Sequence, residues 1–173
     1  ARVTTQGSSG YNLLSYGANS RVIGTNVTAL STNSNAPGAT AWGTTATDNV
    51  ALSLTGGSVQ TQGTNSHGLY ARGALATLSV DGTSVTTSGQ GAFAARVING
   101  TLNASNATLQ ASGVDGTGLG LSSDAGVTAT ATLTGGTLSS AQSDAIAVNG
   151  GTAQVTLTGT QVTGASRWLH VIG

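Results

Sequence analysis

The amino-acid sequence predicts an all-β protein: a right-handed parallel β-helix that forms a single domain over residues 1–173, with three short strands in each of about seven coils. Three observations support this fold class. The composition is typical of strands and turns, one phrase recurs along the chain at the length of a coil, and apolar residues occupy alternate positions within that phrase.

The composition favours strands and turns over helices. Only 6% of the 173 residues are charged, and these are five Arg and five Asp, with neither Lys nor Glu. Helices therefore lack their best surface formers, while Thr, Ser, Asn, Gly and Val are abundant. Low charge with many Gly and Ser is also typical of disordered chains, and the regular spacing described next argues against that alternative.

One phrase recurs through the chain: two apolar residues separated by one residue, then a turn with Gly or Asn, then Val or Leu before Thr or Ser. Its clearest copies are ALSLTGGSVQTQG, ATLSVDGTSVTTSG, GTLNASNATLQASG, ATATLTGGTLSSAQ and AQVTLTGTQVTGAS. The apolar residues after the turns are predicted to stack as the series Val3, Val27, Val59, Val85, Leu109, Leu138 and Val162. Successive members lie 24 to 32 residues apart, which is the length of a three-stranded coil.

The first strand of each coil is expected to supply two inward-facing ladders, because alternate side chains of a strand point to the same face. The first ladder is predicted to hold Leu52, Leu78, Leu102, Ala131 and Val155, and the second Leu54, Val80, Ala104, Leu133 and Leu157. The corner that follows is expected at Gly or Asn, which tolerate a positive φ. Its predicted members are Gly56, Gly82, Asn106, Gly135 and Gly159.

The third strand of each coil is expected to supply the remaining inward-facing ladders. The first is predicted to hold Leu69, Phe93, Leu119, Ile146 and Leu169, and the second Ala71, Ala95, Leu121, Val148 and Val171. Segment 32–41 contains the only proline, Pro37, lies in the longest interval, and is expected to be an exposed loop. An antiparallel sandwich or barrel has similar local patterns, but recurrence at coil length favours the β-helix.

Two of these phrases carry a resemblance to a known family. GGSVQTQGTNSHGLYARG and DGTSVTTSGQGAFAAR resemble the passenger domains of pertactin-like and AIDA-like autotransporters, and the resemblance extends over nearly the whole chain. It implies export through a bacterial outer membrane and display at the cell surface or release from it. The translocator barrel of that family and the stabilising region before it are not among these residues, so we expect a fragment of a longer passenger domain.

Several partners and cofactors are not expected. The formal net charge is zero, which gives no electrostatic attraction for nucleic acid or for an anionic membrane. The longest apolar runs are far too short to span a bilayer, so we expect no direct membrane insertion. There is no Cys for a thiolate metal site and no GGxGxD calcium repeat, so no cofactor is predicted.

The sequence favours a protein that is not an enzyme. β-Helices that cleave polysaccharides use acidic side chains on adjacent strands, whereas the five Asp residues here do not fall on equivalent positions. His67 and His170 are four coils apart and are interpreted as isolated exposed residues, and no GxSxG surrounds a serine. The alternative is a scaffold whose hydrolytic or toxic activity lies in another part of a secreted virulence factor.

Four residues are candidates for surface contacts: Tyr70, Arg72, Arg96 and Trp168. Arg72 and Arg96 recur 24 residues apart at the end of the third strand, so we expect them side by side on adjacent coils. They are interpreted either as a contact for a small anion or acidic glycan, or as two solvated cations. Tyr70 and Trp168 are either recognition residues or isolated surface rings.

The function predicted from these observations is adhesion or self-association of bacterial cells. Outward rows of short polar side chains, such as Thr128, Thr130 and Thr132, could hydrogen-bond to a flat partner. The expected partner is a second copy of the chain, or a host surface protein or glycan. Threonine rows also bind ice, but that function requires a more regular repeat than this one.

Overall fold

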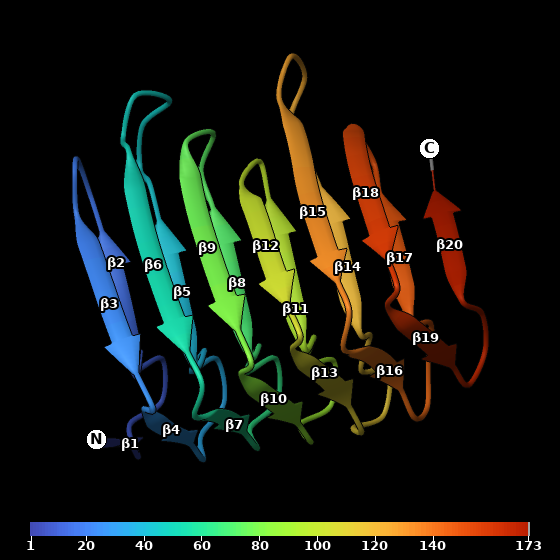
Figure 1. Ribbon diagram of the computed structural model, residues 1–173, viewed down its shortest axis with the longest axis horizontal. Helices are drawn as coiled ribbons and strands as arrows, with labels where there is room; N and C mark the ends of the chain where they lie inside the picture. Colours follow the sequence, from blue (N-terminus) through green and yellow to red (C-terminus); the bar gives the residue numbers. More distant parts are fainter. Residues whose placement is uncertain (173) are drawn as a thin grey trace.

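The computed structural model describes residues 1–172 and, over that range, consists of strands and turns without a helix. Its 20 strands form three parallel sheets, which we call A, B and C (Figure 1). Sheet A holds β1 (Arg2–Thr5), β4 (Thr28–Ser31), β7 (Ser58–Thr61), β10 (Ser84–Thr87), β13 (Thr108–Ala111), β16 (Thr137–Ser140) and β19 (Gln161–Gly164). Sheet B holds β2 (Leu13–Tyr16), β5 (Ala39–Trp42), β8 (Leu69–Arg72), β11 (Ala95–Ile98), β14 (Leu119–Ser122), β17 (Ile146–Asn149) and β20 (Leu169–Ile172). Sheet C holds β3 (Arg21–Thr25), β6 (Val50–Thr55), β9 (Ala76–Asp81), β12 (Thr101–Ser105), β15 (Thr128–Thr134) and β18 (Thr152–Thr158).

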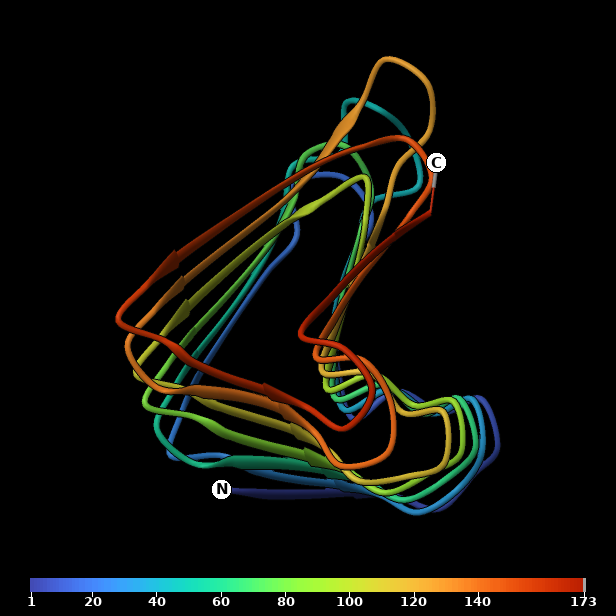
Figure 2. The same ribbon diagram turned by 90° about the vertical axis from the view of Figure 1, so that its right-hand side faces the viewer.

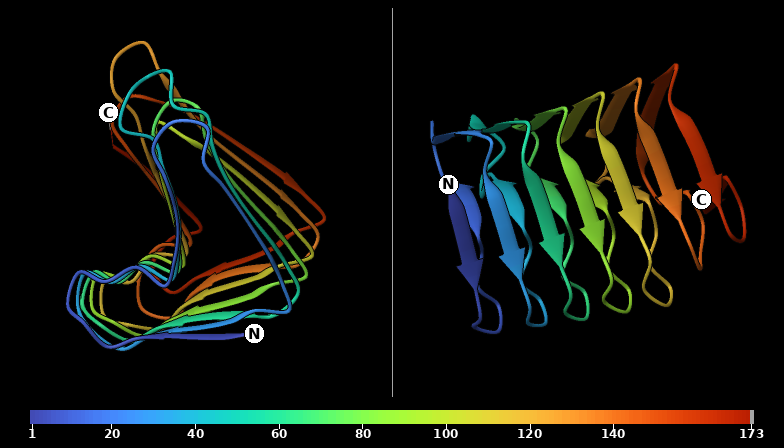
Figure 3. Two further views of the ribbon diagram at one scale, coloured as in Figure 1. Left: turned by 90° about the vertical axis from the view of Figure 1, so that its left-hand side faces the viewer. Right: turned by 60° about the horizontal axis from the view of Figure 1, so that its bottom comes forward.

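The chain begins in sheet A, and each later coil passes through sheets C, A and B in that order. Hydrogen-bonded neighbours in every sheet are three strands apart in sequence. Seven coils stack side by side along the molecule (Figure 3). Seen from the C-terminal end, the chain runs anticlockwise as it approaches the viewer, so the helix is right-handed (Figure 2). The predicted fold class is therefore confirmed.

The cross-section has the shape of an L. Sheets B and C form the two sides of one arm, sheet A forms the base, and the A–B connections bulge outward before they fold back to sheet B (Figure 2). The space between the sheets is filled by buried Leu, Val and Ala side chains in one continuous cluster. The two ladders predicted for the first strand are confirmed by the register of sheet C, in which Leu78 pairs with Leu52 and Leu102.

Three predicted ladder positions are wrong. In sheet A the partner of Val3 and Val59 is Ala29, not Val27, because the corner residue of that coil is Asn26, with φ 51°, three positions earlier. In sheet B the partner of Leu69 is Ala95, not Phe93, and the partner of Ala71 is Val97, not Ala95. All three positions are displaced by two residues. Alternate residues of a strand share a face, so the strand residues expected to point inward still do, whereas the pairing between coils differs from the prediction.

The predicted exposed loop around Pro37 is also wrong. Residues 36–38 are buried, and the connection from β4 to β5 has the same length as the one from β7 to β8. The additional residues of the longer coils lie instead between sheets B and C, at 43–49 and 123–127. No helix among the described residues is long and apolar enough to cross a membrane.

Candidate functional site

The A–B connections bring a column of side chains against the outward face of sheet B. Each of the first five connections contains a residue in the left-handed region, such as Asn65 with φ 54°, which turns the chain back toward the sheets. Gly68 follows three residues later, and a Cβ there would lie 2.3 Å from Val85 Cγ1. The close approach that glycine permits holds the residue before it, His67, at the end of the connection, directly before β8.

A hollow of about 400 Å³ lies beside His67, where the A–B connections meet sheet B, and we call it the corner hollow. Its lining residues are Tyr11, Asn35, Pro37, Trp42, Asn65, His67, Tyr70, Arg72 and Arg96. The first coil contributes one of them, and the next three contribute the rest. Because the lining residues come from four successive coils, the hollow extends along the helix axis.

One half of the corner hollow is organised around His67. The His67 ring lies edge-on to Phe93 at 5.1 Å and to Tyr70 at 5.6 Å between ring centroids. The guanidinium of Arg96 lies 5.3 Å from the Phe93 ring centroid, a cation–π contact, and its Nη1 is 3.1 Å from His67 Nε2. The backbone N–H of Phe93 donates to His67 Nδ1 at 3.1 Å.

The other half is organised around Trp42. Tyr16 meets the Trp42 ring edge-on at 5.6 Å, and Tyr11 lies at 6.1 Å. The guanidinium of Arg72 lies 5.0 Å from the Trp42 centroid. Thr40 faces the same side of β5 and is fully buried, with no hydrogen-bond partner for its hydroxyl among the described residues. Both tyrosine rings and the guanidinium therefore contact Trp42.

A second hollow of about 450 Å³ continues from the first along the B–C connections and shares Trp42 and Arg72 with it. Asp124 and Asn99 lie on its wall, where the Asn99 amide donates to the Asp124 carboxylate at 2.7 Å. The two hollows together form a groove with arginine in its first part and a carboxylate in its second.

The arginines of the corner hollow have no acidic partner. Over residues 1–172, the ion pairs are those of Asp144 with Arg167 and with His170, so the charges of Arg72 and Arg96 are uncompensated by any salt bridge. Burial, with the Arg96 charge as a smaller cause, lowers the pKa of His67 to about 3. The site therefore presents two cations and a neutral imidazole at physiological pH.

The structure brings three of the four predicted contact residues together. Tyr70, Arg72 and Arg96 all line the corner hollow, although the predicted side-by-side placement of the arginines is wrong. Arg96 lies in register with Tyr70, and Arg72 with Ile98, because the step from β8 to β11 is 26 residues rather than 24. Trp168 is four coils from Tyr70, roughly 19 Å along the axis, and is 66% exposed.

Sequence reasoning missed the other half of the site. His67 was predicted to be exposed, but it is 6% exposed and central to the hollow. Tyr11 and Trp42 were not singled out, since they lie in the coils where the repeat phrase is weakest. For Trp42 the available signal was its position, because Trp42 and Arg72 both end a sheet B strand and lie in register.

A cluster of charged residues lies at the other end of the same face. The carboxylate of Asp144 accepts from Arg167 Nε at 3.0 Å and contacts His170 Nδ1 at 2.8 Å. These hydrogen bonds and charges outweigh burial and lower the pKa of Asp144. Both carboxylate oxygens of Asp144 thus have hydrogen-bond partners, and Asp144 lines none of the hollows described here.

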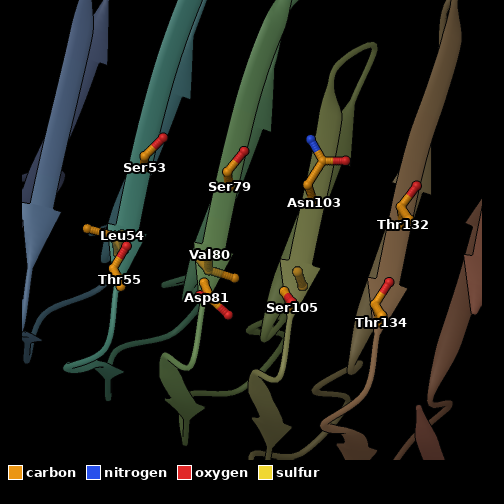
Figure 4. A pocket seen from close by; sticks show the side chains of 11 residues that line it. Ser53, Leu54, Thr55, Ser79, Val80, Asp81, Asn103, Ser105, Thr132 and Thr134 are labelled. Atoms are coloured by element: carbon orange, nitrogen blue, oxygen red, sulfur yellow. The ribbon is translucent and has the colours of Figure 1, made fainter. Parts of the chain in front are cut away.

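The outward face of sheet C is the second candidate surface. Ser53, Ser79, Asn103 and Thr132 form one row across neighbouring strands, and Thr55, Asp81, Ser105 and Thr134 form the next (Figure 4). We call this surface the polar face. Its side chains are short and, in these two rows, Asp81 is the only charged one, so it can lie against another flat surface.

The described residues contain no group of three or more His, Cys, Asp or Glu side chains that could hold a metal ion. Comparison with known proteins finds no similarity: no protein-family model, no curated protein and no solved structure matches the chain. The structure itself identifies the chain as a parallel β-helix of about seven coils.

Proposed function

We propose that the chain is a non-enzymatic adhesive segment of a bacterial surface protein of the autotransporter passenger kind, and that it binds its partner in the corner hollow. The partner is a host surface glycan or protein, and the location is the cell surface or the medium after export through the outer membrane. The resemblance in the repeat phrases supports the class of protein, and the corner hollow supports the place of binding.

The observation that carries this proposal is the gathering of aromatic side chains at one place. Five of the six Phe, Tyr and Trp residues lie in the two groups that surround the hollow. The opposite outward face of the arm carries mainly Ser, Thr and Asn. Aromatic and arginine side chains dominate the energetics of recognition sites, so their concentration in one hollow favours binding there.

The two tryptophans provide a matched test. Beads coated with the purified chain are added to cultured epithelial cells, and adhesion is compared for Trp42→Ala and Trp168→Ala. Loss of adhesion with Trp42→Ala alone supports the proposal, because each variant removes one indole and only Trp42 lines the hollow. Adhesion that survives Trp42→Ala, in a variant with an unchanged circular dichroism spectrum, contradicts it.

Self-association is the second candidate function, and the polar face favours it. A flat surface of hydroxyl and amide groups can pair with its own copy through many weak hydrogen bonds. Like charges placed on both copies repel, so Ser79→Asp with Asn103→Asp is expected to reduce clustering of coated beads. Gln60→Asp with Gln110→Asp adds the same charge on sheet A and is the control, and equal clustering in the two double variants contradicts self-association through the polar face.

A further inference from the structure

We propose that the corner hollow binds the anionic group of an acidic oligosaccharide, a carboxylate or a sulfate, between the guanidinium of Arg96 and the Nε2–H of His67. The inference rests on the function proposed above, because it names the ligand class for the same hollow.

The His67 ring is contacted by two hydrogen-bond donors but has only one acceptor nitrogen. A neutral imidazole has one N–H and one acceptor nitrogen. Two donors converge on this ring: the Phe93 backbone N–H at Nδ1 and Arg96 Nη1 at Nε2, each at 3.1 Å. Only one of these two contacts can be a hydrogen bond in the ligand-free protein.

The Phe93 contact is the one that the protein retains. A backbone N–H that is withdrawn from water and has no acceptor lowers stability, whereas a guanidinium has several donors and can use those that face the hollow. With Phe93 donating to Nδ1, the ring proton is on Nε2. Nε2–H and Arg96 Nη1–H then face each other as two donors with no acceptor between them.

An anionic oxygen in the hollow resolves this arrangement. It accepts from Nε2–H and from the Arg96 guanidinium at once, and both bonds are made to a charged acceptor. Arg72, on the same wall, adds a second positive charge that no acidic residue compensates over 1–172. Asp124 lies in the adjoining hollow, so the anionic group belongs in the corner hollow and neutral parts of the ligand belong beyond Trp42.

The remaining lining favours a saccharide. The exposed amides of Asn35 and Asn65 suit hydroxyl groups, and the aromatic rings suit the apolar faces of sugar rings. Two adjoining hollows of about 400 and 450 Å³ have room for more than one sugar unit. An extended peptide commonly adds a strand to a free sheet edge, but β5, β8 and β11 are each paired on both sides.

The experiment is a calorimetric titration of the full chain with four probes of similar length. These are a tetragalacturonate with carboxylates, a sulfated heparin-derived tetrasaccharide, neutral maltotetraose and a tetra-aspartate peptide. Each is titrated into the unchanged chain and into Arg96→Gln, Arg72→Gln and Arg21→Gln. Arg21 is exposed on sheet C and gives a control with the same loss of charge.

We expect at least one acidic tetrasaccharide to bind at least about tenfold more tightly than maltotetraose, and Arg96→Gln to weaken it about tenfold to a hundredfold. Arg72→Gln weakens the same ligand, and Arg21→Gln leaves it unchanged. Whether the carboxylate or the sulfate probe responds identifies the anionic group.

A pair of substitutions tests the His67 donor separately. Gln at position 67 can accept from the Phe93 N–H and still donate into the hollow, whereas Phe can do neither. We therefore expect His67→Gln to keep most of the affinity for the acidic tetrasaccharide and His67→Phe to lose about tenfold.

Several outcomes overturn the inference. If maltotetraose binds as tightly as the acidic tetrasaccharides and Arg96→Gln does not change the affinity, the hollow has no anion site, although it can still be an adhesive groove. Binding of tetra-aspartate alone replaces the saccharide with an acidic peptide. No binding of any probe, with bead adhesion still dependent on Trp42, removes the ligand class while the proposed function stands.

Discussion

His67 is a buried imidazole in the connection that precedes β8. It is 6% exposed and accepts a backbone hydrogen bond from the next coil. Its side chain therefore connects two coils and borders the corner hollow at the same time. A sequence pattern gives little sign of this, because a histidine in a glycine-rich connection is equally compatible with an exposed turn.

The buried state of His67 predicts a pH dependence of stability. The pKa falls from 6.5 to about 3 on folding, so the unfolded chain takes up a proton between these values that the folded chain does not. The free energy of unfolding should therefore decrease as pH falls through that window, by about 2 kcal/mol between pH 7 and pH 5.

Urea denaturation at pH 7 and pH 5 checks this for the unchanged chain and for His67→Phe. Both values lie above the range in which carboxylates titrate, so Asp48, with its pKa lowered to about 2 by hydrogen bonds from Thr45 and Thr44, stays ionised. We expect the loss to shrink in His67→Phe. An equal loss in both proteins would show that His67 is not the group responsible.

At the scale of strands and connections, the sequence predicted well which strand residues point inward. It predicted less well which residues pair between adjacent coils. Alternation identified Leu69 and Ala71 as inward and Tyr70 as outward, which the structure confirms. Alternation could not decide whether Phe93 or Ala95 is the partner of Leu69, because residues two positions apart have the same predicted face. Phe was preferred because it is the more apolar of the two. Phe93 in fact belongs to the connection, in the column of His67, where an outward aromatic ring packs against Arg96.

The glycine before sheet B gives a prediction about these connections. A Cβ at position 68 would lie 2.3 Å from Val85 Cγ1 and 2.6 Å from the Ala94 carbonyl oxygen, so Gly68→Ala should destabilise the chain by about 1–3 kcal/mol. Gly7→Ala is the control, since a Cβ there meets nothing within 4 Å. Similar urea midpoints for the two variants would mean that the connection can move away from sheet A at little cost.

At the scale of the whole molecule, stability comes from stacking, because one coil cannot bury its own apolar face. Leu78 is fully buried between Leu52 and Leu102 in the middle of the stack. We expect Leu78→Ala to cost about 2–5 kcal/mol, measured by chemical denaturation. Leu75→Ala removes the same atoms from a side chain that is 50% exposed and should cost less than about 1 kcal/mol, so comparable losses would contradict this core.

The fold was predictable because its signal is repeated in every coil, and the site was only partly predictable because it depends on differences between coils. The Gly and Asn corners recur, and each adds to the same conclusion. The corner hollow instead combines Tyr11, Trp42, His67 and Arg96, one from each of four successive coils. Such a set can be recognised only when the pairing between coils is known for every residue. The predicted pairing was wrong by two residues at Phe93.

The most direct test of binding in the corner hollow uses the fluorescence of Trp42. The chain has two tryptophans, so Trp168→Phe leaves Trp42 as the only one, and Trp42→Phe leaves Trp168. We predict that the acidic tetrasaccharide changes the emission of the Trp168→Phe protein saturably, and that adding Arg96→Gln shifts this titration to higher ligand concentration. A response from Trp168 alone, or none from either tryptophan while calorimetry reports binding, would place the ligand outside the corner hollow and contradict the account.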